Sequence, residues 1–194
     1  MQMEDTQLVP APRAQVWAAL NNPEILKACI PGCESLTMTS PTEMIATVVV
    51  KVGPVKAKFS GKVTLSDLDP PNGYRITGEG SGGVAGFAKG GATVQLSPDG
   101  PAATLLHYIV DVQIGGKLAQ LGSRLIDSTA KKLAGEFFHA FAAAVAAESQ
   151  VAAEPDSPSV EVDAVSPTEA SGWLSRLIAA LKRLLGMEAL STTR

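Results

Sequence analysis

The sequence has few of the residues that build catalytic centres and metal sites. Its 194 residues include two histidines and two cysteines, and aromatic residues make up only 5%. Cys29 and Cys33 are separated by three residues with no histidine nearby, a poor spacing for a metal site, so we interpret them as ordinary thiols. His107 and His139 are the only imidazoles, and their spacing suggests no catalytic triad. This composition argues against an enzyme.

The sequence also lacks long apolar runs and an excess of positive charge. No run of about twenty apolar residues is present, which excludes an ordinary transmembrane helix. The N-terminus, MQMEDTQL, is acidic and does not resemble a signal peptide. The formal net charge of −3 provides no general basic field for nucleic acid. We therefore expect a cytoplasmic protein that does not bind nucleic acid.

A glycine-rich run, GEGSGGVAGFAKGGA, occupies residues 78–92. It contains no phosphate-loop string, and no helix follows it directly within a β-α-β unit. The run therefore does not indicate a nucleotide-binding site.

The sequence is rich in patterns typical of antiparallel strands. From Val55 to Leu65, apolar residues alternate with polar ones, three of which are lysines, so one face of the strand is predicted to be buried and the other solvated. Turns rich in Pro, Gly, Asn and Asp separate the segments. The predicted strands are 2–9, 34–39, 42–52, 55–65, 74–80, 85–96 and 104–113, with short helices at 12–21 and 24–28.

A long helix is predicted from Lys117 to Ala147, because leucine, phenylalanine and valine recur there at steps of three or four or their multiples. A single long helix buries such a stripe against the concave face of a curved antiparallel sheet. The predicted fold is therefore α+β, of the helix-grip type.

Small residues dominate the faces of the middle strands that are predicted to point inward. Gly78, Gly80, Ala88, Gly90 and Ala92 face the long helix if alternation holds. Such a sheet leaves an apolar cavity beneath the helix; the alternative is that the glycines only bend the sheet and let the helix close in. We expect the cavity. The residues predicted to line it are Trp17, Phe59, Phe87, Tyr108, Leu121 and Leu125.

The C-terminal residues form a tether and a surface-binding helix in our interpretation. Residues 149–170 are acidic and proline-containing, which predicts a disordered linker after a folded domain at 1–148. Residues 171–187 predict an amphipathic helix, and 188–194 a disordered tail. A leucine face opposite cations favours the surface of an anionic membrane, with a groove on a partner protein or packing on the same domain as alternatives. The membrane-binding residues are predicted to be Trp173, Leu174, Arg176, Leu177, Ile178, Leu181, Lys182, Arg183, Leu184 and Leu185.

Four segments resemble the CoxG family, the G subunits of carbon monoxide dehydrogenase. This family is a branch of the START-like, polyketide-cyclase-like superfamily. They are VWAALNNPEILKACIPGCESL (16–36), VGPVKAKFSGKV (52–63), GEGSGGVAGFAKGGATVQL (78–96) and DVQIGGKLAQLGSRLIDSTAKKLAGEFF (111–138). The resemblance implies a helix-grip fold with an apolar cavity. It also implies a non-catalytic accessory role beside a molybdenum-containing dehydrogenase, placing that enzyme at the cytoplasmic membrane. It supplies no catalytic residues.

These observations together predict a carrier. The tail helix docks on the inner leaflet, the domain serves carbon monoxide dehydrogenase or a related molybdenum hydroxylase, and the cavity holds an apolar small molecule. A respiratory quinone, menaquinone or ubiquinone, is the ligand we expect, with Tyr108 donating a hydrogen bond to a head-group carbonyl. No covalent cofactor is expected. A pure tether without a ligand and a cyclase-like enzyme are the alternatives.

Overall fold

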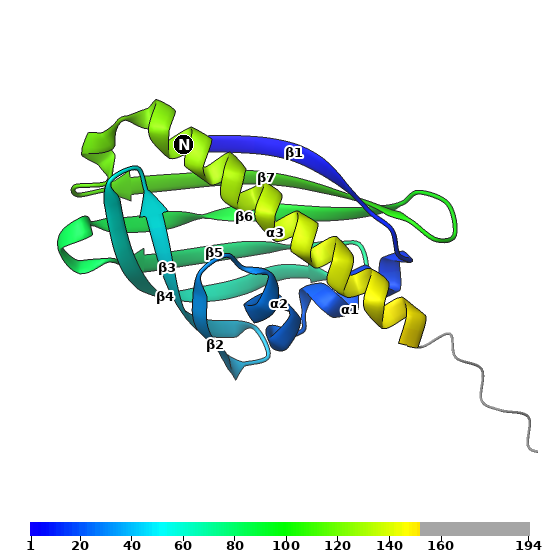
Figure 1. Cartoon of the computed structure of the whole chain (residues 1–194). Helices are drawn as coiled ribbons and strands as arrows, with labels where there is room; N and C mark the ends of the chain where they lie inside the picture. Colours follow the sequence, from blue (N-terminus) through cyan, green and yellow to red (C-terminus); the bar gives the residue numbers. More distant parts are fainter. Residues whose placement is uncertain (152–194) are drawn as a thin grey trace, which may run out of the picture. The chain divides into compact units, whose positions relative to one another are not determined.

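The structure is a computed structural model that describes residues 1–151, with side chains through residue 148. Seven antiparallel strands form one sheet in the order β1-β7-β6-β5-β4-β3-β2. The sheet curves around one long helix, α3, which crosses its concave face (Figure 1). The elements are β1 Gln2–Val9, α1 Arg13–Leu20, α2 Pro23–Cys29, β2 Cys33–Ser40, β3 Glu43–Val52, β4 Val55–Asp69, β5 Gly73–Ser81, η1 Gly83–Ala85, β6 Phe87–Pro98, β7 Thr104–Gly115, η2 Ala119–Leu121 and α3 Ser123–Val151. The predicted helix-grip fold is confirmed. The predicted tail helix and C-terminal tail, and the linker beyond residue 151, lie outside the described residues.

The start of the long helix was predicted wrongly. Instead of beginning at Lys117, α3 begins at Ser123, after the 3₁₀ turn η2. Gly116 and Gly122 adopt φ values of 78° and 87°, a left-handed backbone that an α-helix does not tolerate. The apolar stripe therefore continues through the connection before α3, although the helix itself does not.

Alternation along the strands holds as predicted, and β4 shows it most clearly. Ala57 and Leu65 are buried, whereas Lys58 and Lys62 are exposed on the convex face. The ammonium groups of Lys58 and Lys62 each lie 2.6 Å from a carboxylate oxygen, that of Glu34 on β2 and that of Glu43 on β3 respectively. These exposed pairs contribute little stability, so burial of the concave face defines the register.

Two short helices close one end of the concave face. Asn22 is the N-cap of α2, since its side-chain oxygen accepts hydrogen bonds from the backbone amides of Glu24 and Ile25. Pro23 occupies the first helical position. Trp17 of α1 packs edge-on against Tyr74 of β5, with ring centroids 5.5 Å apart. The two helices thus cap the sheet where its inner residues are large.

The described residues contain no helix that is long and apolar enough to cross a membrane.

Candidate functional site

The inner face of the sheet changes character from one end to the other. Strand register aligns Leu96 with Leu106, and Val94 with Tyr74 and Tyr108, in rows of large side chains near α1 and α2. Further along the same strands the aligned rows become small. One row is Val63, Gly78, Gly90 and Val112, and the next is Ala46, Gly61, Gly80, Ala88 and Ile114. The concave face therefore carries large side chains across its middle strands at one end and only glycine or alanine on β5 and β6 at the other.

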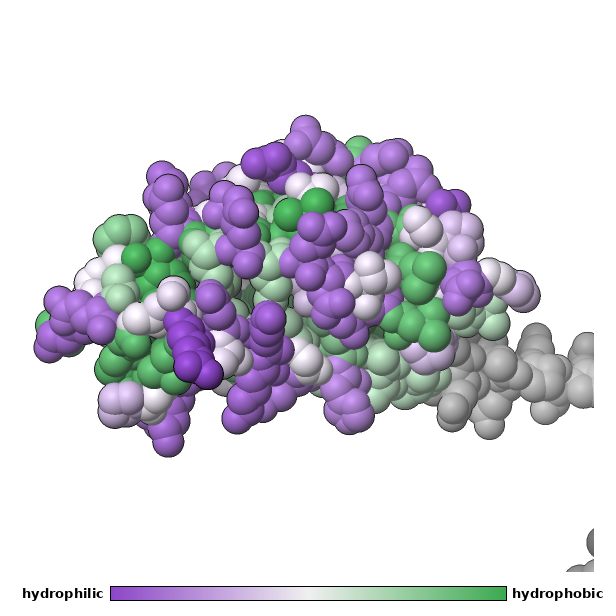
Figure 2. All heavy atoms as spheres, turned by 90° about the horizontal axis from the view of Figure 1, so that it is seen from above, coloured by the Kyte–Doolittle hydropathy of each residue, from purple (hydrophilic) through white to green (hydrophobic). Residues whose placement is uncertain are grey.

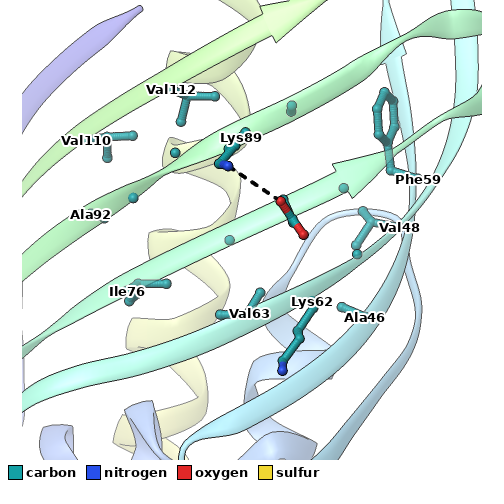
Figure 3. A pocket seen from close by; sticks show the side chains of 17 residues that line it. Ala46, Val48, Phe59, Lys62, Val63, Ile76, Lys89, Ala92, Val110 and Val112 are labelled. Carbon is teal, nitrogen blue, oxygen red and sulfur yellow. Dashed lines mark ion pairs between the residues drawn. The ribbon is translucent and has the colours of Figure 1, made fainter.

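An apolar pocket of about 360 Å³ lies over the small rows (Figure 3). Its inner lining comes from β3 to β7 and includes Phe59, Val63, Ile76, Val110 and Val112. These inner residues carry no ionisable group. The charged residues Lys62, Glu79 and Lys89 also border the pocket, and the Lys89 ammonium lies 3.8 Å from the Glu79 carboxylate. The volume is within the range of small-molecule sites, roughly 300–1,000 Å³.

A second pocket of about 170 Å³ continues the hollow beneath the first half of α3. Phe59 and Ala88 line both pockets, so the two spaces are neighbours. The helix contributes Ile126, Ala130 and Leu133 to this lining. Thr129 is the one polar residue that α3 contributes to this lining, and its hydroxyl donates a 2.8 Å hydrogen bond to the Leu125 carbonyl. The lining thus offers a ligand shape and apolar contact rather than polar partners.

The glycines of the small rows have two different roles. A Cβ atom at Gly90 would lie 2.1 Å from the Asp111 carbonyl oxygen, and one at Gly61 would lie 2.4 Å from the Glu79 carbonyl oxygen. At Gly80 the nearest atom would be 3.6 Å away, an ordinary contact. Gly61 and Gly90 therefore permit close approach of neighbouring strands, whereas Gly80 leaves space for a ligand.

Of the six residues predicted to line the cavity, the structure places Phe59 in both pockets of the concave face. Leu125 packs over the β3–β4 turn, with its Cδ2 atom 2.9 Å from the position that a Cβ on Gly53 would take. Leu121 is half-buried in η2. Phe87 lies half-exposed at the start of β6 and lines a shallow groove on the convex side.

Trp17 and Tyr108, the other two, belong to the packed end. Tyr108 is buried and stacks on Phe138, with ring centroids 5.0 Å apart. Burial, and secondarily the charge of Asp5, raises the pKa of the Tyr108 hydroxyl. The hydroxyl is therefore a neutral hydrogen-bond donor at physiological pH.

The two histidines lie away from the apolar pockets. His107 is on the convex face of β7, where its ring nitrogens lie 3.1 Å from the Thr6 hydroxyl and 3.4 Å from the Glu4 carboxylate. His139 is exposed on α3. Neither histidine lines the apolar pockets. Within residues 1–148 no three His, Cys, Asp or Glu side chains form a cluster suited to a metal.

The comparison with protein families identifies the chain. The family model that describes the G subunit of carbon monoxide dehydrogenase (CoxG) matches residues 6–146. This protein belongs to the CoxG family. No curated protein matches its sequence.

Solved structures support the same fold. A conserved protein from Geobacillus kaustophilus is 28% identical, with a TM-score of 0.73, covering 76% of this chain and 97% of that one. A START superfamily protein from Mycobacterium smegmatis is 14% identical, with a TM-score of 0.60 and coverage of 76% and 98%. An aromatase/cyclase from Streptomyces is 13% identical, with a TM-score of 0.57 and coverage of 79% and 98%. The last two show the fold alone.

The sequence interpretation missed most of the pocket lining. Val63, Ile76, Val110 and Val112 line the pocket, but alternation alone did not distinguish them from inner residues at the packed end. The missing information was the register, which decides which inner residues of five strands share a row.

Proposed function

We propose that this CoxG-family protein is a non-catalytic accessory protein that carries an apolar, lipid-like ligand, a respiratory quinone, in its hollow. The observation that carries the proposal is the apolar pocket lined by aliphatic side chains, Phe59 and bare glycine backbone, with a second apolar pocket beside it beneath α3. A quinone has a flat head and an isoprenoid tail, both suited to a lining with few polar groups. Phe59 is the best-placed contact for the ligand. We propose the Tyr108 hydroxyl, at the packed end of the concave face, as the neutral donor to a head-group carbonyl.

The partner we propose is a soluble molybdenum hydroxylase such as carbon monoxide dehydrogenase, which the carrier links to the inner face of the cytoplasmic membrane. The family name supports the association with that enzyme. Residues 171–187 are the proposed membrane-binding helix and residues 152–170 the proposed linker, because residues 149–151, predicted to belong to the linker, are part of α3. Leu177→Glu combined with Leu181→Glu is expected to abolish liposome binding by that helix, since burial of each leucine contributes roughly 1.5–3 kcal/mol.

A cyclase-like enzyme is the weaker alternative, although one structural neighbour is an aromatase/cyclase. Such chemistry needs an acid or base facing the substrate. The inner residues of the pocket are apolar, and the charged residues that border it, Lys62, Glu79 and Lys89, lie on strand positions whose side chains are exposed on the convex face.

Two experiments separate the carrier from a pure tether. Mass spectrometry of organic extracts of the full chain, purified from its native host, is expected to find a quinone; an extract free of apolar ligand would refute the carrier. Deleting residues 150–194 is expected to remove the tail's contribution to membrane localisation in either case. Only a carrier retains quinone binding after that deletion.

A further inference from the structure

One end of the domain is built from three chain segments that lie together at the hollow end of the sheet. We call them the rim: the β3–β4 turn (51–56), the loop between β5 and β6 (82–87), and the connection from β7 to α3 (115–124). The amide of Leu118 donates a 3.1 Å hydrogen bond to the Ala85 carbonyl, and the Leu125 side chain packs over Gly53. The three segments meet at the left end of the domain in Figure 1.

The rim is strongly cationic in a protein whose net charge is negative. It contains Lys51, Lys56, Lys117 and Arg124 and no acidic residue, whereas the whole chain carries −3. All four side chains are exposed, and none of them forms an ion pair with a described residue. Lys51 and Lys56 also face each other directly across the hairpin, a pairing of like charges that destabilises a sheet. Stability therefore does not explain this charge.

The rim also exposes apolar side chains between these cations. Val84 is 85% exposed and Phe87 is 52% exposed. Figure 2 shows hydrophobic surface interleaved with hydrophilic side chains at this end of the domain, on the left of the view. Exposed aliphatic and aromatic groups among cations match the interface of an anionic bilayer, where the apolar groups insert and the cations meet lipid phosphates.

The hollow lies directly behind the rim. The pocket beneath α3 is lined by Val52, Ala88, Ile114 and Leu118, each of which lies in the rim or adjoins it in the chain. Gly83 and Gly86 have left-handed φ values of 60° and 119°, so the loop that carries Val84 follows a path that few other residues permit. A ligand that entered between the rim segments would reach apolar surface at once.

We propose that the rim is a second membrane-docking surface of this protein, which seats the hollow end of the domain on an anionic bilayer so that the apolar ligand passes between lipid and pocket. The inference rests on the proposed function for its ligand, but docking itself is independent of the tail helix. Val84 and Phe87 insert into the interface, and Lys51, Lys56, Lys117 and Arg124 contact lipid headgroups.

The test uses the full chain with its tail disabled by Leu177→Glu and Leu181→Glu, so that the remaining vesicle binding reports on the domain. Vesicles of phosphatidylcholine with phosphatidylglycerol are the probe, in a flotation assay at low salt. Residual binding is expected, and it should fall with added salt because surface charges are screened. Phosphatidylcholine alone should bind far less.

Variants of the rim are then compared with matched variants elsewhere. Val84→Glu is expected to lower residual binding about tenfold or more, and Lys51→Gln with Lys56→Gln about fivefold per cation. The apolar control is Leu68→Glu. Leu68 is 44% exposed and lies near the end of β4, outside the rim. The charge control is Arg75→Gln with Lys131→Gln, both exposed outside the rim. Neither control should alter binding.

Three outcomes would overturn the proposal. They are absence of residual binding, equal losses in the rim and control variants, and loss of binding to the purified dehydrogenase with vesicle binding unchanged. The last would assign the rim to a protein partner. Each outcome leaves the quinone content of the protein unaffected, so failure here is distinguishable from failure of the proposed function.

Discussion

The two ends of the concave face use the same strands to opposite effect. Near α1 and α2, Tyr74, Val94 and Leu106 are buried in one hydrophobic cluster with Phe141 and Val16. At the other end the same strands line the apolar pocket with small residues, Gly78, Gly80, Ala88, Gly90 and Ala92. A protein interior is normally packed throughout. The packed end therefore supplies the stability that lets the other end remain hollow.

Truncating a large side chain at each end gives the largest expected contrast. Phe141 is fully buried, so Phe141→Ala is expected to lower the free energy of unfolding by about 3–5 kcal/mol. Leu133 lines the hollow and is half-buried, so Leu133→Ala should cost about 2 kcal/mol or less. Urea denaturation of both variants measures the difference. Equal losses would contradict the distinction between a packed and a hollow end.

The two classes of glycine give the next largest contrast. Gly90→Ala forces a Cβ against the Asp111 carbonyl and is expected to cost about 1–3 kcal/mol. Gly80→Ala meets only ordinary contacts and should be neutral or stabilising by up to about 1 kcal/mol. Thermal unfolding of the two variants decides this. If Gly80→Ala were as damaging as Gly90→Ala, the row of small residues would exist to bend the sheet and not to leave space.

The smallest expected effect is on how the folding stability contributed by Tyr74, in the packed end, depends on pH. Burial raises the pKa of Tyr74 well above its usual 10.0, so the folded state holds a proton that the unfolded state releases. The contribution of Tyr74 to the free energy of unfolding is therefore fully present below pH 10. It falls as the pH rises above 10, by at most about 1.4 kcal/mol per pH unit. Tyr74→Phe should flatten the decline of the melting temperature between pH 10 and 11. An unchanged slope would contradict the burial argument.

Local patterns predicted most of the fold, because the spacing of apolar residues within one segment is enough to assign that segment to a strand or a helix. Alternation on β4 identified Ala57 and Leu65 as inward, and the spacing of Phe137, Phe141 and Val145 identified the helix face. The helix start was misplaced because the apolar stripe continues across Gly122, whose left-handed backbone interrupts the helix. Periodicity reports which residues are apolar and at what spacing, but it does not report the backbone path between them.

The candidate site depended on long-range register and was predicted less well. Trp17 and Tyr108 are inward aromatic residues, as expected, yet both stand in the packed end beside Tyr74 and Phe138. Phe59 lies across from them in the hollow. Spacing along the sequence does not tell whether an inward aromatic residue lies in the packed end or in the hollow. That depends on which strand positions align and on where α1 and α2 cover the sheet.

The central claim is that the hollow end is kept open for a ligand. The most direct measurement is the quinone bound per molecule of full-length protein in the parent, Gly80→Leu and Thr77→Leu proteins. The side chain introduced by Gly80→Leu would project into the pocket, whereas Thr77 lies on the same strand with its side chain exposed on the convex face. The account predicts quinone in the parent and in Thr77→Leu and its loss from Gly80→Leu, with folding intact in all three. Equal quinone content in the two variants, or none in the parent, would contradict it.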